Sequence, residues 1–471
     1  MSDIDRRRFL QRSALVTGGV LLAPSLRGLT FWSRGAAGDQ RAAVRRAGLG
    51  DGGYGPLVSA GPDLDLPAGF TYVALGVAGS RMSDGLPTPL AHDGMSAFTL
   101  PNGNVRLIRN HEVRFASPDW MSRNVSKAYD RKAGGGTVSL EVRVGKDGTR
   151  ELVRDFLSLS GTAVNCAGGP TPWRSWLTCE ETTQGARAAF EKEHGYIFEV
   201  PVSAEAEVTP VPLKAMGRFV HEAVAVDRRT GIVYETEDMR FDAERNTPGA
   251  GFYRFIPRMR ERLVDGGRLQ MLAIRDRPRY RTFTGQRPGA TLPVVWVDID
   301  DPDPADAEAN PFAVSSQGFA KGAAVFQRLE GCWFGDNRIF FHATSGGDAG
   351  KGQVWQYRPR GSSRGELTLL FESPGGEVLD SPDNITVSPH GGLVICEDGA
   401  ADGQQFVRGL TRDGRIFDIA RNRANTSEFA GACFSPDGRT LFVNVQGSLN
   451  PTASVPGKTF AIWGPWERGA L

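Results

Sequence analysis

The sequence predicts an all-β protein, and within that class a β-propeller of six blades. Three observations favour this fold. Short β-prone runs alternate with turn pairs such as Asn102-Gly103 and Asp437-Gly438, which is the signature of β-hairpins. A unit of strand, glycine turn, strand and acidic residue recurs along the chain, as expected for a propeller. Glycine and proline, with 59 and 29 of 471 residues, fit short strands and turns better than long helices. A β-sandwich pair is the structural alternative.

The N-terminal residues have the pattern of an export signal. Arg6-Arg7-Arg8 precedes an apolar run at residues 13–23, and the small residues 35–38 offer a cleavage site. This order is typical of a twin-arginine (Tat) signal, and the run is too short for a membrane anchor. We therefore expect a signal peptide and flexible leader at residues 1–40 and a single propeller domain at residues 41–471. The mature protein should be a periplasmic or secreted monomer with no stable membrane anchor, exported by the Tat machinery.

Five pairs of β-prone runs predict hairpins along the domain. In each pair a short turn, most often containing glycine, separates two runs that alternate apolar and polar residues. Helices should be few, at residues 186–193 and 257–264. The hairpins are expected at residues 97–108, from residue 138 through Asp147-Gly148, and at 223–234, 385–395 and 434–443.

Charge, cysteine content and the absence of several motifs restrict the classes of function that this protein can have. A net charge of +1 gives no electrostatic basis for binding nucleic acid. The five cysteines are an odd number, so at least one thiol is free or bound to metal. The sequence contains no CxxC pair, HExxH helix, GxSxG elbow or P-loop, which argues against a zinc finger, a zincin, a serine hydrolase and a P-loop enzyme.

Acidic residues gather at the predicted strand ends. In a propeller these ends converge on one axis, where repulsion and desolvation make bare carboxylates costly unless cations neutralise them. Oxygen ligands of this kind suit calcium, and a cysteine among them suits a transition metal such as iron. The two cysteines that could serve are Cys179, beside Glu180-Glu181, and Cys166. The acidic segments are Asn110-His111-Glu112, Cys179-Glu180-Glu181, His221-Glu222, Glu235-Thr236-Glu237-Asp238, Arg328-Leu329-Glu330, Ser381-Pro382-Asp383-Asn384 and Cys396-Glu397-Asp398.

All of these segments except Cys396-Glu397-Asp398, in this order, resemble the PhoX-type alkaline phosphatases. The resemblance covers roughly residues 80–466 and extends to the C-terminal block Phe434-Ser435-Pro436-Asp437-Gly438. It implies a propeller whose channel holds an iron–calcium cluster that hydrolyses phosphate monoesters. By motif, Cys179, Glu222, Glu330 and Asp383 would bind iron or bridge to calcium. Asn110, Glu112, Glu397 and Asp398 would bind calcium, and Arg328 would be the catalytic residue that holds the substrate phosphate.

Two other functions are compatible with the same pattern. A calcium-dependent propeller lactonase or phosphotriesterase-like hydrolase would use carboxylate and asparagine ligands without a thiolate. A non-catalytic exported propeller would bind a ligand or partner around purely structural metals. Iron at stoichiometric level would separate the phosphatase from the first, and phosphatase activity of the metal-loaded protein would separate it from the second.

Overall fold

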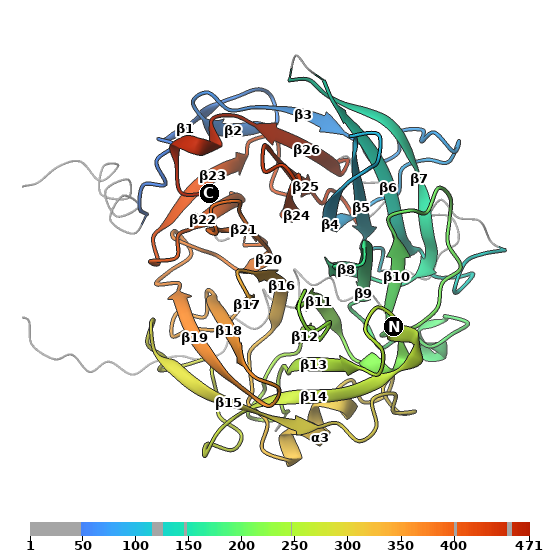
Figure 1. Cartoon of the computed structure of the whole chain (residues 1–471), viewed down its shortest axis with the longest axis vertical. Helices are drawn as coiled ribbons and strands as arrows, with labels where there is room; N and C mark the ends of the chain where they lie inside the picture. The colour runs from blue at the N-terminus through green and yellow to red at the C-terminus, as the bar shows by residue number, and fades with distance from the viewer. Residues whose placement is uncertain (1–48, 115–125, 146–147, 246, 400–402, 450–454) are drawn as a thin grey trace, which may run out of the picture. The chain divides into compact units, whose positions relative to one another are not determined.

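The inner strands of the fold surround a common axis, and the other strands lie outside them (Figure 1). Each inner strand contacts the next, and the last contacts the first, so the ring is closed. The computed structural model describes residues 49–114, 126–145, 148–245, 247–399, 403–449 and 455–471, all within the compact unit Arg45–Leu471. The inner strands are β4 (His92–Thr99), β8 (Asn165–Pro170), β11 (His221–Val226), β16 (Leu329–Gly335), β20 (Pro382–Val387) and β24 (Phe429–Phe434).

Each inner strand begins an antiparallel meander that runs outward from the axis. The outer strands are β5 (Val105–His111), β6 (Gly135–Val144) and β7 (Arg150–Thr162) after β4; β9 (Ser175–Glu180) and β10 (Ile197–Pro201) after β8; β12 (Val233–Glu237), β13 (Phe252–Pro257), β14 (Gly267–Ile274) and β15 (Thr291–Asp298) after β11; β17 (Arg338–Ala343), β18 (Gln353–Arg360) and β19 (Arg364–Glu372) after β16; β21 (Leu393–Glu397), β22 (Phe406–Leu410) and β23 (Ile416–Asn422) after β20; and β25 (Thr440–Val445) and β26 (Lys458–Trp463) after β24.

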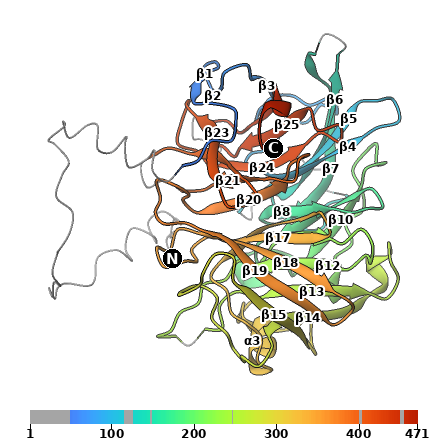
Figure 2. The ribbon, with the colours of Figure 1, turned by 60° about the vertical axis from the view of Figure 1, so that its left-hand side comes forward.

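Pairing between outer strands joins two of these meanders, and N-terminal strands extend two others. The outer strands β15 and β19 pair, so the β11 and β16 meanders form one nine-stranded sheet (Figure 2). N-terminal strands complete the last two sheets: β3 (Thr71–Leu75) pairs with β26, and β2 (Leu64–Pro67) pairs with β23 and with β1 (Leu57–Ser59). The N-terminal and C-terminal parts of the described chain therefore share sheets, which closes the ring.

The hydrophobic core is divided between neighbouring meanders. Leu177 of the β8 meander packs with Val224 of the β11 meander, and Phe252 packs in one cluster with Phe341 of the β16 meander. Four further clusters fill the remaining interfaces around the ring. Sheets buried on both faces in this way are the architecture of a propeller. The predicted all-β propeller is confirmed, whereas the six blades stay a prediction, because strand pairing groups the described strands into five sheets.

The predicted hairpins are confirmed by strand pairs such as β4–β5 and β24–β25. The Asn102-Gly103 turn works because Gly103 has a φ of 85°, in the region that glycine adopts without steric cost. No helix among the described residues is long and apolar enough to cross a membrane. The expected leader at residues 1–40 lies outside the described part of the chain.

Both predicted helices are wrong in extent. Residues 186–193 form only a 3₁₀ turn, Ala186–Ala188, because Gly185 provides no capping side chain and Ala189 turns left-handed with a φ of 70°. Residues 257–264 end strand β13 and enter the 3₁₀ turn Leu263–Asp265. Helix α3 (Ala313–Ala320) was not predicted, because its serines and glycine favour helix weakly and it is held by its packing on β14. Two further 3₁₀ turns are Lys214–Met216 and Trp466–Arg468.

Candidate metal centre

A short irregularity at the start of each inner strand directs one side chain to the axis. In five of the six strands the pairing register shifts directly around the second and third residues, as at Asp93-Gly94, which fall between the pairs His92–His111 and Met95–Arg109. In β24 the shift falls between Ala430 and Cys433. Such bulges bend a strand and re-aim a side chain. The second residues of the six strands, in chain order, are Asp93, Cys166, Glu222, Glu330, Asp383 and Ala430.

The third residue is Gly or Ala in five of the six inner strands, which lets neighbouring inner strands approach closely, and in β20 it is Asn384. A Cβ atom added to Gly331 would lie 2.5 Å from the Asp383 carbonyl oxygen, and one added to Gly431 would lie 2.4 Å from that of Asp93. Gly94 faces Ala167 in the same way, with a Cβ–Cα distance of 2.6 Å. The small residues thus hold the second-residue side chains of adjacent strands close together.

A second ring of side chains follows the second strand of each meander. The first residue after that strand donates its backbone N–H to the carbonyl of the residue two positions before the axial one, as Glu112 does to Ala91 at 2.8 Å. Asp238 does so to Val220 at 3.1 Å. This repeated hydrogen bond fixes the side chain beside the axial residue. The second-ring residues are Glu112, Glu181, Asp238, Thr344, Asp398 and Gln446.

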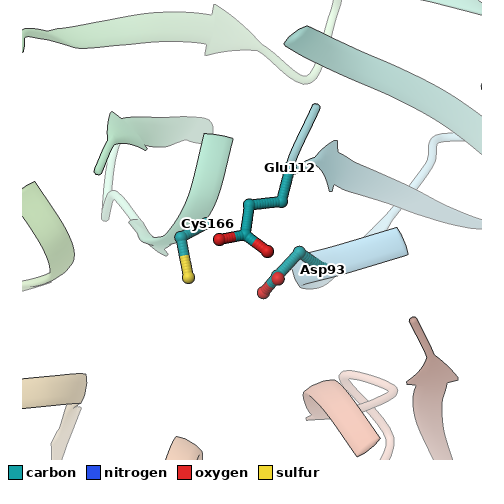
Figure 3. Close-up of side chains that lie close together, drawn as sticks. All are labelled: Asp93, Glu112 and Cys166. Carbon is teal, nitrogen blue, oxygen red and sulfur yellow. The ribbon is translucent and has the colours of Figure 1, made fainter. Parts of the chain in front are cut away.

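The two rings bring metal-binding atoms together in three groups. Figure 3 shows the first, in which Asp93, Glu112 and Cys166 extend toward one another from separate segments. In each group the ligand atoms lie within 4.8 Å of one another. Cys166 belongs to two groups, so these two share a ligand. The groups are Asp93, Glu112 and Cys166; Cys166, Glu222 and Asp383; and Glu181, Asp238 and Glu330.

Burial makes the charged forms of these groups unfavourable. Desolvation, followed by the charges of Glu330, Glu181 and Asp383, raises the pKa of Glu222 well above its usual range. Desolvation and then Asp383 raise the pKa of Asp93, and desolvation and then Asp93 raise that of the Cys166 thiol. The Cys166 thiol donates to Glu222 Oε1 at 3.0 Å, whereas the buried Oε2 atom has no hydrogen-bond partner among the described residues. Cations would offset these costs, and the oxygen and sulfur donors present fit hard and thiophilic metal ions respectively.

Arg328 lies against the third group. Its guanidinium pairs with Asp238 through Nε–Oδ1 at 2.9 Å and Nη2–Oδ2 at 2.8 Å, and donates to Glu330 Oε1 at 2.7 Å. Its backbone φ of 51° turns the chain into β16 two residues before Glu330. The side chain is 14% exposed, so a solute at the axis can reach it.

Four of the predicted metal ligands are placed together by the structure. Glu222, Glu330 and Asp383 are axial second residues, and Glu112 is in the second ring. They were predictable because each ends or opens a recognisable β-prone run.

Three other predicted ligands lie elsewhere or have other partners. The Asn110 amide donates to the carbonyls of Cys166 and Ala167 at 3.0 and 2.7 Å, and its oxygen accepts from Trp176 at 2.8 Å, so it fixes the β8 bulge. Glu397 pairs with the buried Arg408 at 2.9 Å.

Asp398 occupies the second ring but belongs to none of the three groups among the described residues. Its carboxylate interacts with that of Glu428, and desolvation and then Asp398 raise the pKa of Glu428.

The structure corrects the choice of cysteine. Cys179 lies on β9, one strand away from the axis, in a hydrophobic cluster with Leu177 and Ile197. Desolvation raises the pKa of its thiol. The inner strand carries Cys166 in its place. Adjacency to Glu180-Glu181 was misleading, because Cys179 lies within β9 and packs in the core, whereas Glu181 follows the end of the strand and joins a ligand group.

Asp93, Glu181 and Asp238 were not among the predicted ligands. A signal for Asp93 was available: an axial residue followed by Gly or Ala recurs at the start of five of the six inner strands, and Asn384 takes that place in the sixth. The six copies are His92-Asp93-Gly94, Asn165-Cys166-Ala167, His221-Glu222-Ala223, Leu329-Glu330-Gly331, Pro382-Asp383-Asn384 and Phe429-Ala430-Gly431.

Fold and site together define a β-propeller whose carboxylates and thiol form a candidate metal centre. The family model "Alkaline phosphatase PhoX" matches residues 52–448. The chain therefore belongs to the PhoX alkaline phosphatase family, and the expected enzyme class is confirmed.

The comparison with solved structures agrees with the fold. Pseudomonas fluorescens PhoX in complex with vanadate, described as a transition state analogue, is similar with a TM-score of 0.65 and 18% identity over 88% of this chain and 98% of that one. A gluconolactonase-like protein has a TM-score of 0.36 and 13% identity over 87% and 98% of the two chains. A glucose dehydrogenase-like protein of Thermus thermophilus has a TM-score of 0.36 and 12% identity over 83% and 99%. No curated protein sequence matches this chain.

Proposed function

We propose that this chain hydrolyses phosphate monoesters at the propeller axis with iron and calcium bound by the three ligand groups. The observation that carries the proposal is the gathering of buried and half-buried carboxylates and one buried thiol from different blades into these groups. A phosphate monoester carries about two negative charges at neutral pH. The bare carboxylates would repel it, so substrate binding requires cations in excess of this negative charge.

The donor chemistry suggests how the ions are distributed. Cys166, Glu222 and Asp383 combine a thiol with carboxylates, which suits iron. The group of Glu181, Asp238 and Glu330 offers only oxygen, which suits calcium. When bound, the metal ions supply Lewis-acid charge for the phosphoryl oxygens and for the activation of water.

The protein's own residues position these ligands and the substrate. Gln446 Nε2 donates to Asp93 Oδ2 at 3.1 Å and to Glu112 Oε2 at 2.7 Å, which orients both carboxylates before a cation binds. The Arg328 guanidinium presents a planar set of donors that matches two phosphate oxygens and stabilises the negative charge of the transition state. Its contacts with Asp238 and Glu330 keep it directed at the axis.

The resemblance to exported proteins extends the proposal to the leader. Residues 1–40 would direct Tat export, leaving residues 41–471 as the mature domain outside the cytoplasm. Replacement of Arg6 and Arg7 by lysine should retain the protein in the cytoplasmic fraction. Periplasmic accumulation of this variant at the wild-type level would contradict Tat export.

Metal-dependent hydrolysis of p-nitrophenyl phosphate tests the activity. Protein loaded with iron and calcium should hydrolyse the ester, and chelation should abolish the activity until the metals are restored. Glu222→Gln should lose bound metal and activity by at least about 100-fold, because it removes a charge from the iron group. Glu151→Gln, at the exposed outer end of β7, is the matched control and should keep both. Metal-loaded wild-type protein without phosphatase activity would contradict the proposal.

A further inference from the structure

A second arginine lies against the acidic residues of the axis. Arg114 follows β5, and its Nη2 atom contacts Glu112 and lies 3.2 Å from Glu181 Oε2. Glu112 and Glu181 belong to different ligand groups, so one guanidinium bridges two of the three groups. The Arg114 side chain is 28% exposed, so solvent reaches it.

Arg114 and Arg328 contact the same ligand group from different blades. Arg114 contacts Glu181, and Arg328 contacts Asp238 and Glu330. Every carboxylate of this group therefore has a guanidinium as a partner. The two arginines come from the meanders that begin at β4 and β16, so the propeller itself brings them together.

A cation in this group changes the surroundings of both arginines. Metal ions and guanidinium groups compete for the same carboxylate oxygens. Once the oxygens bind a cation, each guanidinium lies beside a positive charge with its own charge less compensated, which is unfavourable unless an anion is present. A phosphate group satisfies this need, because its oxygens can accept from a planar guanidinium and contact cations at the same time.

We propose that Arg114 is a second substrate-binding residue, which together with Arg328 holds the dianionic phosphate group. The inference rests on the function proposed above and adds a specificity to it. A monoester can offer oxygens to both guanidiniums, whereas a diester has one charge fewer and an ester group in place of one terminal oxygen. Arg114 therefore favours monoesters over diesters.

The test compares Arg114→Ala and Arg114→Lys with the control Arg143→Ala, which removes an exposed arginine paired with Glu151 at the outer end of β6. Three quantities are measured, the first two on metal-loaded protein and the third on its metal-free form. They are KM and kcat for p-nitrophenyl phosphate and bis(p-nitrophenyl) phosphate, the dissociation constant of inorganic phosphate by calorimetry, and the affinity of the metal-free protein for calcium.

We expect Arg114→Ala to raise the monoester KM and the dissociation constant of phosphate by about tenfold or more, as for the loss of a charge-assisted hydrogen bond. The effect on the diester should be several-fold smaller, and Arg114→Lys should recover part of the loss. Calcium affinity should stay equal or increase, because a competing positive charge has gone. Arg143→Ala should change none of these quantities.

Two results would overturn the inference. Unchanged KM and phosphate affinity with tighter calcium binding would make Arg114 only a counter-charge for the metal-free carboxylates. Loss of calcium binding would make it a positioning residue for Glu112 and Glu181. If the wild type binds phosphate but hydrolyses neither ester, the proposed function fails, and the calorimetric comparison of wild type with Arg114→Ala still decides the role of Arg114.

Discussion

Two cysteines on the neighbouring strands β8 and β9 have different surroundings and therefore different expected roles. Cys166 lies on the inner strand β8 and contacts Glu222, whereas Cys179 lies on β9 within a hydrophobic cluster. Thiolate character and metal binding depend on neighbouring cations and ligands, and a thiol among aliphatic side chains is only a small packing group.

Replacing each cysteine separates these roles. Cys166→Ala should lose most of the bound iron and the phosphatase activity, because it removes the only sulfur ligand from two groups of the described residues. Cys179→Ala should keep the metal and the activity and should lower the free energy of unfolding by about 1 kcal/mol through a small cavity. Elemental analysis and chemical denaturation measure both effects. Loss of iron in Cys179→Ala with retention in Cys166→Ala would reverse the assignment.

The start of the inner strand is the repeating element on which the centre depends. It combines an axial side chain, a register shift and, in five of the six strands, a Gly or Ala, and the second strand of each meander then contributes one further residue. The small residue is required where the next inner strand passes closely, as Gly331 does at the Asp383 carbonyl.

A methyl group at Gly331 should therefore disturb both folding and metal binding. Its Cβ would lie 2.5 Å from the Asp383 oxygen and 2.7 Å from the Ile385 nitrogen, both backbone atoms that cannot move independently. We expect Gly331→Ala to lower the free energy of unfolding by about 1–3 kcal/mol and to weaken metal binding by separating Glu330 from Asp383. Gly50→Ala, where the new atom would come no closer than 3.3 Å to its nearest neighbour, Arg415 Cβ, should have a smaller effect. Equal effects of the two substitutions on metal affinity would contradict this role.

The hairpins were predictable because their signals are local. Asn102-Gly103 supplies the left-handed turn conformation, and the flanking runs alternate with the period of a strand. The axial ligands were only partly predictable, because an acidic strand end such as Glu397 looks the same whether it faces the axis or pairs with a buried arginine such as Arg408. That difference depends on contacts between strands distant in sequence. The α3 helix was missed for the same reason, since packing on β14 outweighs its weak propensity.

The ring as a whole is also held by polar contacts between blades. His194 lies between β9 and β10, and Asp130 lies before β6 of the neighbouring meander. The His194 ring is 2.6 Å from Glu180 Oε1 and 3.5 Å from Asp130 Oδ2. Burial alone would lower the pKa of His194. The attraction of Glu180, together with that of Asp130, outweighs burial and raises the pKa of His194 to about 9.

This histidine should make the free energy of unfolding fall as the pH becomes alkaline. A folded pKa of about 9 above an unfolded value of about 6.5 means that its contribution is fully present below pH 6.5 and is lost as the pH rises through 9. The contribution is up to about 3 kcal/mol from this difference. Chemical denaturation between pH 6 and 10 should show a decline in wild type that His194→Gln largely lacks. The exposed His390→Gln is the control and should keep the wild-type slope. An identical decline in wild type and His194→Gln would exclude this origin.

The central claim is that side chains from separate blades share metal ions at the axis. The most direct measurement is anomalous X-ray diffraction at the iron edge from crystals of the metal-loaded protein. We expect an iron peak within bonding distance of Cys166 Sγ and of the carboxylates of Glu222 and Asp383. A peak bonded to Cys179 instead, or no iron at the axis of an active enzyme, would contradict this claim.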